Sequence, residues 1–323
     1  TDAVLSEALG EIYVKKYFPQ ESKNRMLKLV ANLQEALQQH IEHLDWMSEE
    51  TKARALEKLA AITVKIGYPD KWRDYTALEI SPEKSYWENL KNASKFETAY
   101  MLEKVGKEVD KSIWYMSPQT VNAYYNPTTN EICFPAGILQ PPFFYADADD
   151  AVNYGAIGVV IGHEMTHGFD DMGRQFDKDG NLSDWWTSED TRQFNLRADI
   201  LADQYSSIIV IDTVHADGRF TLGENIADQG GLRVAYTAFE NATEGEKLPI
   251  IDGFTPEQRF YLAYANLWAS NIRDEEILRR TKTDPHSLGK WRVNAALRNI
   301  ETFYQAFGIT PMYMAPEDRV VIW

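Results

Sequence analysis

The sequence His163-Glu164-Met165-Thr166-His167 constrains this chain most, because it places two imidazoles and a carboxylate within about one helical turn. Residues four apart lie on one face of a helix, about 6 Å from each other, so both imidazoles can reach a single ion. The intervening glutamate is rotated by about 100° around the axis, where it can reach a water bound to that ion. An H-E-x-x-H arises by chance in on the order of 1% of chains of this length and histidine content.

The residues before this motif predict that it lies on a buried helix. The run AIGVVIG at 156–162 is apolar apart from its glycines, and we expect a helix from Asp149 to Asp171. Two histidines and a glutamate buried there without partners would be costly. A core helix with incidental polar residues is therefore the weaker interpretation, and a metal site is the stronger one.

A catalytic zinc needs a third protein ligand and an open position for water. Glu224 begins a second predicted helix, and Asp228 lies four residues on, on the same face. We expect Glu224 to complete the zinc ligands with His163 and His167, one ion per chain. Asp228 would accept the free ring N–H of a ligand histidine and fix its tautomer, and Asp170 is a second candidate for this role. An isolated E-x-x-x-D pair would otherwise be interpreted as a solvated helix face.

The remaining sequence predicts a mainly α fold with a small β-sheet, that is, an α+β protein. Apolar residues recur with a helical period through much of the chain, whereas alternation and β-branched residues mark two strands in the middle. We expect helices within 2–60 and at 83–105, 188–206, 222–241, 255–273 and 289–306, and strands at Val121–Tyr125 and Glu131–Phe134.

Composition excludes some functions. The chain has 33 Lys and Arg against 49 Asp and Glu, a formal net charge of −16, which argues against nucleic acid as a partner. Cys133 is the one cysteine, so no intramolecular disulfide can form. The sequence contains no run of 18 or more apolar residues, so it predicts no membrane span. The chain opens at Thr1 without an initiator methionine or signal peptide, so we expect a part of a longer protein.

Three segments, at residues 121–144, 163–186 and 223–231, resemble the neprilysin and endothelin-converting enzyme family of zinc metallopeptidases, which includes the bacterial oligopeptidase O. The resemblance runs from about residue 118 to Trp323, and more weakly through the helical first third. It implies a thermolysin-like gluzincin zinc lobe that faces a mostly helical second lobe across a cavity. It also implies a metalloendopeptidase that hydrolyses oligopeptides on the N-terminal side of bulky hydrophobic residues.

The resemblance implies roles for single residues. Glu164 would be the general base, and Asp228 would support catalysis beside the zinc. Asn122 and Ala123 match the residues that bind the substrate backbone as an added strand, which agrees with how exposed strand edges pair with extended peptides. His286 would donate to the oxyanion and Arg292 would bind substrate.

The sequence also departs from the family. Vertebrate members carry a cysteine near the C-terminus that this chain lacks, which favours an oligopeptidase O-like bacterial member. For the location, which the sequence leaves unknown, the bacterial cell envelope or another extracytoplasmic site is favoured over the cytoplasm. Members are about twice this length, so the chain would be the C-terminal catalytic half. We expect 1–117 to form part of the second lobe and the inter-lobe linker, and 118–323 to form the catalytic domain. The missing N-terminal half is then a candidate partner.

Two other functions stay open at this point. A gluzincin aminopeptidase would carry a G-x-M-E-N motif before the zinc helix, and this sequence has N-A-Y-Y-N-P there instead. A zinc-binding protein without turnover is the second alternative. It includes an inactive fragment that needs its N-terminal half.

Overall fold

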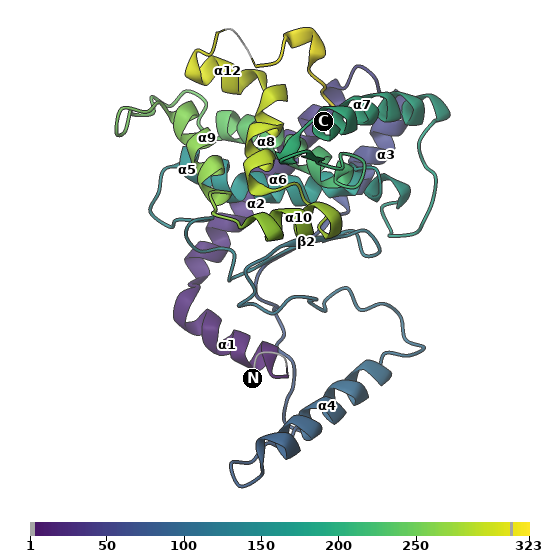
Figure 1. Cartoon of the computed structure of the whole chain (residues 1–323). Helices are drawn as coiled ribbons and strands as arrows, with labels where there is room; N and C mark the ends of the chain where they lie inside the picture. Colours follow the sequence, from purple (N-terminus) through teal and green to yellow (C-terminus); the bar gives the residue numbers. More distant parts are fainter. Residues whose placement is uncertain (1–3, 311–312) are drawn as a thin grey trace. The chain divides into compact units, whose positions relative to one another are not determined.

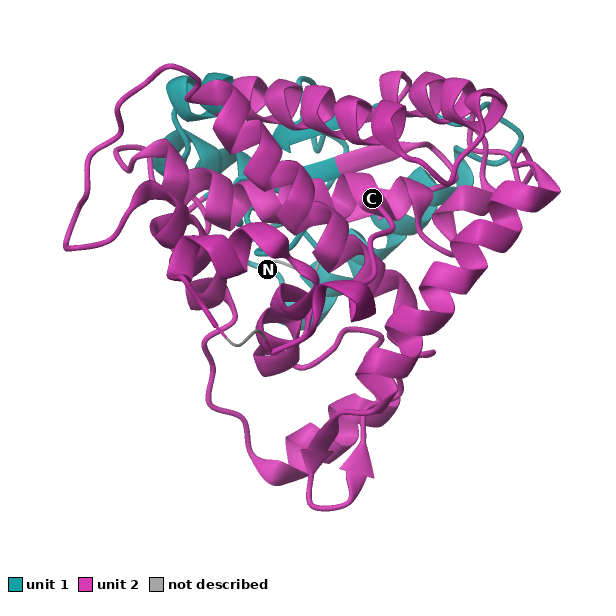
Figure 2. Cartoon of the chain, turned by 90° about the horizontal axis from the view of Figure 1, so that it is seen from above, with its two compact units in different colours: residues 1–25, 64–123, 133–139 teal, residues 26–63, 124–132, 140–323 magenta. Residues whose placement is uncertain are grey.

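The computed structural model describes residues 4–310 and 313–323 of the chain. These residues divide into two compact units that each combine segments distant in the sequence (Figure 2). Unit 1 comprises 1–25, 64–123 and 133–139, and unit 2 comprises 26–63, 124–132 and 140–323. The predicted mainly α fold with a small sheet is confirmed (Figure 1). Within the described residues, no helix is long and apolar enough to cross a membrane.

Helices form most of the regular structure (Figure 1). The α-helices are α1 (Ser6–Tyr17), α2 (Gln20–His43), α3 (Glu49–Ala60), α4 (Tyr86–Leu102), α5 (Asp150–Asn153), α6 (Val159–Thr166), α7 (Ser188–Ser206), α8 (Leu222–Ala242), α9 (Pro256–Leu267), α10 (Asp274–Thr283), α11 (Gly289–Asn294) and α12 (Glu301–Phe307). Between them lie a π-helical segment, η1 (Tyr154–Gly158), and the 3-10 turns η2 (His167–Phe169), η3 (Gly173–Gln175), η4 (Ala296–Asn299) and η5 (Pro316–Asp318).

The strands form two small sheets. One has the order β1-β3-β2, with β1 at Thr63–Gly67, β3 at Glu131–Pro135 and β2 at Tyr124–Asn126. The other pairs β4 (Ile209–Ile211) with β5 (Val214–His215) as an antiparallel hairpin. The predicted strand from Val121 begins later than expected. Asn122 Oδ1 accepts a hydrogen bond from the Ala123 N–H at 3.0 Å, which takes this donor away from strand pairing.

In unit 1, α4 and the loop before it are held by local capping and an arginine. The Ser85 side chain accepts from the Glu88 N–H while the Glu88 carboxylate accepts from the Ser85 N–H, a full capping box. Arg73 donates to both carboxylate oxygens of Glu97 at 2.8 and 2.9 Å, and its guanidinium lies 3.9 Å from the Tyr100 ring centroid. The helix is therefore tied to the loop by charge and by ring contact.

In unit 2, α3 begins at the predicted cap, Ser48, but its second capping partner comes from a distant helix. No glutamate or glutamine follows three residues after Ser48, where Thr51 stands. Instead, Asp190 of α7 accepts hydrogen bonds from the Ser48 N–H at 2.8 Å and from the Thr51 hydroxyl at 2.6 Å. A buried carboxylate thus performs the role of a capping-box residue and joins α3 to α7.

The centre of unit 2 is the crossing of α6 and α8, where glycines let the two backbones approach closely. A Cβ on Gly231 would lie 2.6 Å from the Val159 carbonyl oxygen and 2.7 Å from the His163 nitrogen. A Cβ on Gly162 would lie 2.9 Å from the Gly231 Cα. Only glycine fits at these positions, and the close crossing brings the first turn of α8 beside the last turn of α6.

Several elements differ from the sequence-based expectation. The predicted helix from Asp149 to Asp171 is one helical run up to Phe169, but it contains the π-helical segment η1. The predicted helix 289–306 is interrupted, because Ile300 has extended backbone angles and the Asn299 side chain accepts from the Val320 N–H. Strand β1, helix α10 and the β4-β5 hairpin were not predicted from the sequence.

Candidate metal centre

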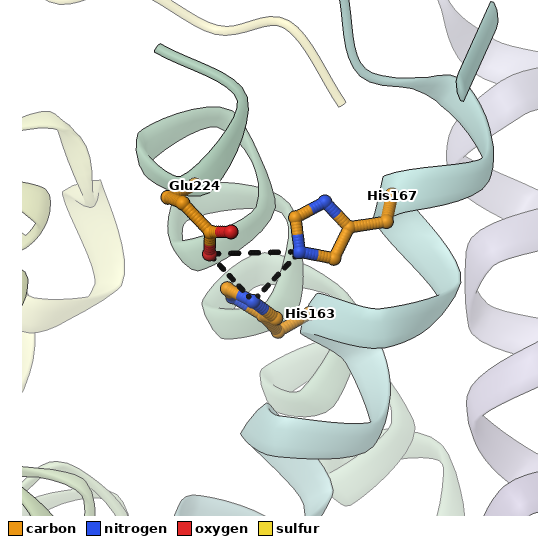
Figure 3. A group of neighbouring side chains, drawn as sticks. All are labelled: His163, His167 and Glu224. Carbon is orange, nitrogen blue, oxygen red and sulfur yellow. Dashed lines mark hydrogen bonds and ion pairs between the residues drawn. The ribbon is translucent and has the colours of Figure 1, made fainter. Parts of the chain in front are cut away.

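Two imidazoles from the end of the α6 run face each other. His163 lies within α6, and His167 opens the following 3-10 turn. Their Nε2 atoms are 3.0 Å apart, and Figure 3 shows both rings directed toward the same point. The i, i+4 spacing predicted from sequence therefore places both rings on one face, as helix geometry requires.

Glu224 meets these rings from the first turn of α8. Its Oε2 lies 3.2 Å from the His163 Nε2 and 3.6 Å from the His167 Nε2 (Figure 3). The three residues can each offer one ligand atom to a metal ion, and these atoms lie within 4.8 Å of one another. The glycine contact between α6 and α8 is what allows this approach.

Two further carboxylates fix the orientation of the rings. Asp228 Oδ1 lies 2.9 Å from the His163 Nδ1, and Asp170 Oδ2 lies 2.7 Å from the His167 Nδ1. Each carboxylate can only accept, so each Nδ1 carries the proton. In the neutral rings, both Nε2 lone pairs then face Glu224, which is the tautomer that metal-binding histidines use.

This donor set fits a tetrahedral zinc. Zinc bonds to nitrogen and oxygen ligands are about 2.0–2.2 Å long, which puts tetrahedral ligand atoms about 3.3 Å apart. The observed separations are 3.0, 3.2 and 3.6 Å. Glu224 Oε2 is also buried without a hydrogen bond within the described residues. Three converging lone pairs repel one another unless a cation lies between them.

The electrostatics favour a positive charge at this point. Burial lowers the pKa of His167, but the hydrogen bond to Asp170 and the charges of Asp170 and Glu224 outweigh it and hold the pKa well above its ordinary value. Burial and His167 likewise lower the pKa of His163, yet Asp228 and Glu224 raise it overall. Burial raises the pKa of Glu224, but the two imidazoles lower it far below its usual range. Without a metal, protons would supply the missing charge.

Glu164 follows His163 on α6 and is buried, with 8% of its surface exposed. The helix turns it by about 100° from the histidine face. Glu164 therefore lies off the helix face that carries His163 and His167.

Asp228 also holds a buried arginine. Arg292 of α11 donates from Nε to Asp228 Oδ2 at 2.8 Å and from Nη2 to Asp228 Oδ1 at 2.6 Å. Its guanidinium carbon lies 3.8 Å from the Trp268 ring centroid. Asp228 is thus an anion that links Arg292 to His163.

The pKa of Asp228 is the net result of two opposed effects. Burial of the carboxyl raises the pKa, and the Arg292 guanidinium together with the His163 ring lowers it by more. The same pairing raises the pKa of Arg292 above its ordinary range despite its burial. Both groups are therefore charged at neutral pH, and each satisfies the other in a buried environment.

A third imidazole approaches Glu224 from the loop before α11. His286 Nε2 lies 3.2 Å from Glu224 Oε2, and its Nδ1 lies 2.9 Å from Asp284 Oδ1. The loop is fixed to α8 because the Ser287 hydroxyl donates to Asn225 Oδ1 at 2.7 Å. The side chain of His286 is 40% exposed, which leaves it accessible from solvent.

The structure therefore brings together seven sequence-predicted residues of unit 2, namely His163, His167, Asp170, Glu224, Asp228, His286 and Arg292. Glu164 follows His163 on α6. Asn122 and Ala123 belong to unit 1, so their contact with substrate stays a prediction. Asp284, which contacts the His286 ring, was not predicted from the sequence. The D-x-H spacing was a usable signal, because an aspartate two residues before a histidine can accept from its backbone N–H, as Asp284 does at 3.0 Å.

Family models and relatives agree on one assignment. Residues 122–320 match the model of peptidase family M13, and residues 1–69 match a second, N-terminal model of the same family. Human neprilysin is 41% identical over 99% of this chain and 44% of its own length. Neprilysin-3 of Drosophila melanogaster is 38% identical over 100% of this chain and 42% of its own length.

Solved structures give the same result. The zinc metalloprotease Zmp1 of Mycobacterium tuberculosis, in complex with an inhibitor, aligns with a TM-score of 0.93 and 45% identity over 100% of this chain and 50% of its own. PepO of Lactobacillus rhamnosis aligns with a TM-score of 0.91 and 32% identity, again over 100% of this chain and 50% of its own. The chain spans about half the length of the relatives it matches. By family model and by structure, this chain belongs to peptidase family M13.

Proposed function

We propose that this chain carries the zinc centre of an endopeptidase that hydrolyses oligopeptides, with His163, His167 and Glu224 as the metal ligands. The observation that carries the proposal is the convergence of two imidazole Nε2 atoms and one carboxylate oxygen at 3.0–3.6 Å, each ring being fixed by its own carboxylate. Membership of peptidase family M13 supports the same activity.

In the proposed reaction, the ion would activate water and the carbonyl, and residues of the chain would transfer the proton. A zinc ion bound here would act as a Lewis acid that lowers the pKa of water toward about 7 and polarises the scissile carbonyl. Glu164 takes a proton from the attacking water and passes it to the leaving amine. Its position on α6, next to His163 but outside the ligand face, supports this role.

His286 donates a hydrogen bond to the developing oxyanion. Because its Nδ1 faces the Asp284 carboxylate at 2.9 Å, donation from Nε2 requires the doubly protonated ring. The carboxylates of Glu224 and Asp284 lie 3.2 and 2.9 Å from its two ring nitrogens. Donors of this kind contribute about 3–4 kcal/mol to the transition state in comparable enzymes.

Arg292 of unit 2 is the proposed substrate-binding residue nearest to the ligands in contact terms, through Asp228. Arg292 uses Nε and Nη2 for Asp228, which leaves its Nη1 as the donor that can meet a substrate carbonyl. Asn122 and Ala123 lie just before β2, where an extended peptide can add to the sheet edge. We infer that the substrate is cleaved on the N-terminal side of a bulky hydrophobic residue, as the family resemblance implies.

The test is hydrolysis of quenched-fluorescent oligopeptides by the purified chain. We expect turnover that a chelator abolishes and stoichiometric zinc restores, with cleavage before hydrophobic residues. Turnover unaffected by chelator in a zinc-free sample would contradict the proposal.

A zinc-binding chain without turnover is the second candidate, because the chain spans about half the length of its relatives. In that case the chain binds zinc but cleaves peptides only after the N-terminal half of a relative is added in trans. Cleavage by the chain alone, at the rate of the mixture, would exclude this alternative.

A further inference from the structure

Lys58 of α3 lies outside the ligand set, yet it is among the most deeply buried charged side chains, with 1% of its surface exposed. Its Nζ lies 2.7 Å from each of three carbonyl oxygens, those of Gly168, Gly173 and Phe176. An ammonium has three N–H donors, whereas a neutral amine has two. Three acceptors at this distance match the ammonium form.

The three carbonyls all belong to the segment that follows the zinc-binding helix. Gly168 comes directly after His167, at the end of the helical run, where carbonyl groups lack helical partners and a cation is stabilising. Gly173 and Phe176 close the next turn. One side chain from another helix therefore satisfies carbonyls that span this whole loop.

The same loop carries Asp170, the carboxylate that orients His167. Asp170 Oδ1 accepts from the Met172 N–H at 2.9 Å and from the Gly173 N–H at 2.6 Å, while its Oδ2 faces the His167 ring. Lys58 binds the carbonyl of the same Gly173. The Gly173 residue is thus held by Asp170 through its N–H and by Lys58 through its C=O.

Gly173 also packs directly on the ligand backbone. A Cβ at this position would lie 1.7 Å from the His167 carbonyl oxygen, so no other residue fits without moving the loop. A displacement of Gly173 would therefore move both the Asp170 carboxylate and the backbone beside His167.

We propose that Lys58 is a positioning residue for the metal centre: its ammonium anchors the 168–176 loop so that Asp170 holds the His167 ring in the metal-binding tautomer. This inference rests on the zinc site proposed above. Burial lowers the pKa of Lys58 to about 7, while the charges of Asp170 and Asp177 raise it, so the loop carboxylates support the ammonium in turn. His163 is oriented by Asp228 on α8 and does not depend on this loop.

A double-mutant cycle on zinc affinity tests this assignment. Lys58→Met removes the donors and the charge but keeps an unbranched side chain of similar length. Asp170→Asn and Asp228→Asn each disturb one histidine partner. Lys52→Met is the matched control, because this lysine of the same helix donates to the Glu42 carbonyl at 3.0 Å, away from the loop. All variants are made in the 323-residue chain, and the zinc dissociation constant is measured at one fixed pH.

We expect Lys58→Met to weaken zinc binding roughly 10–100-fold, the range seen for outer-shell partners, and Lys52→Met to leave it unchanged. In the Asp170→Asn background, Lys58→Met should have little further effect, since both act on His167. In the Asp228→Asn background its effect should be fully additive. A general loss of packing would give the same effect in both backgrounds.

Equal effects of Lys58→Met in the two backgrounds would overturn the positioning role while leaving the zinc site intact. Absence of zinc binding in the unmodified chain would overturn the site and the inference together. If Lys58→Met does not fold, Lys58→Gln replaces it in the same cycle, because glutamine keeps N–H donors without the charge. Its effects on zinc affinity in the Asp170→Asn and Asp228→Asn backgrounds are compared in the same way.

Discussion

Substitution of Gly231 by alanine perturbs the contact on which the whole centre depends. The added Cβ would lie 2.6 Å from the Val159 carbonyl oxygen and 2.7 Å from the His163 nitrogen, whereas ordinary contact begins at 3.4 Å. The neighbours are backbone atoms of α6 and cannot rotate away. The two helices must therefore separate locally by about 0.8 Å.

The effect on folding should be smaller than the effect on metal binding. Overpacking in a core costs about 1–3 kcal/mol, and alanine regains up to about 1 kcal/mol of helix propensity over glycine. A zinc site, however, tolerates changes in ligand distance of only about 0.2 Å. Since the displacement separates Glu224 from both histidines, we expect zinc binding to weaken by more than the roughly 10–100-fold cost of losing an outer-shell partner.

Gly158→Ala is the matched control for this prediction. It lies in the same helical run, five residues before His163, but the atoms nearest to its Cβ are at 3.5 Å. The assay is zinc titration of both variants by calorimetry, with thermal unfolding of the metal-free chains in parallel. Wild-type zinc affinity in Gly231→Ala, or equal losses in the two variants, would refute the close crossing as the basis of the site.

Three further predictions follow from the site. Glu164→Gln should keep zinc and lose peptide turnover, because an amide cannot accept the proton from water; retained turnover in a metal-loaded sample would remove Glu164 from the mechanism. His286→Ala should lower kcat and kcat/KM together with little change in KM, since the proposed hydrogen bond forms with the oxyanion; a rise in KM alone would make it a substrate-binding residue. Zinc affinity should fall as the pH is lowered through the raised pKa of His167, because protons and metal compete for Nε2. Calorimetry in buffers of different ionisation enthalpy measures the protons released on zinc binding. A pH-independent affinity would argue against His167 as a ligand.

The convergence of the three candidate ligands was predictable because each part of the arrangement has a local signature. The i, i+4 histidines and the apolar run before them define a buried helix with two imidazoles on one face. The spacing of four between Glu224 and Asp228 likewise places both carboxylates on one face of α8. Helical periodicity also predicted a helix at 188–206, and α7 has these bounds in the structure.

Contacts between distant segments were not predictable, because no local pattern encodes them. Lys58 and the Gly168 carbonyl are 110 residues apart, and Asp190 caps a helix 142 residues before it. A lysine in an amphipathic helix is normally interpreted as a solvated side chain. The break at Ile300 was missed for the same reason, since the Asn299 side chain finds its partner 21 residues later at Val320.

The most direct test of the account is the metal itself. Elemental analysis and X-ray absorption of the purified chain measure how many zinc ions it holds and which atoms bind them. The account predicts one zinc per chain with two imidazole nitrogens and a carboxylate oxygen at about 2.0–2.2 Å, and loss of the metal in His167→Ala. Full zinc occupancy in His167→Ala, or a ligand shell without two imidazoles, would contradict it.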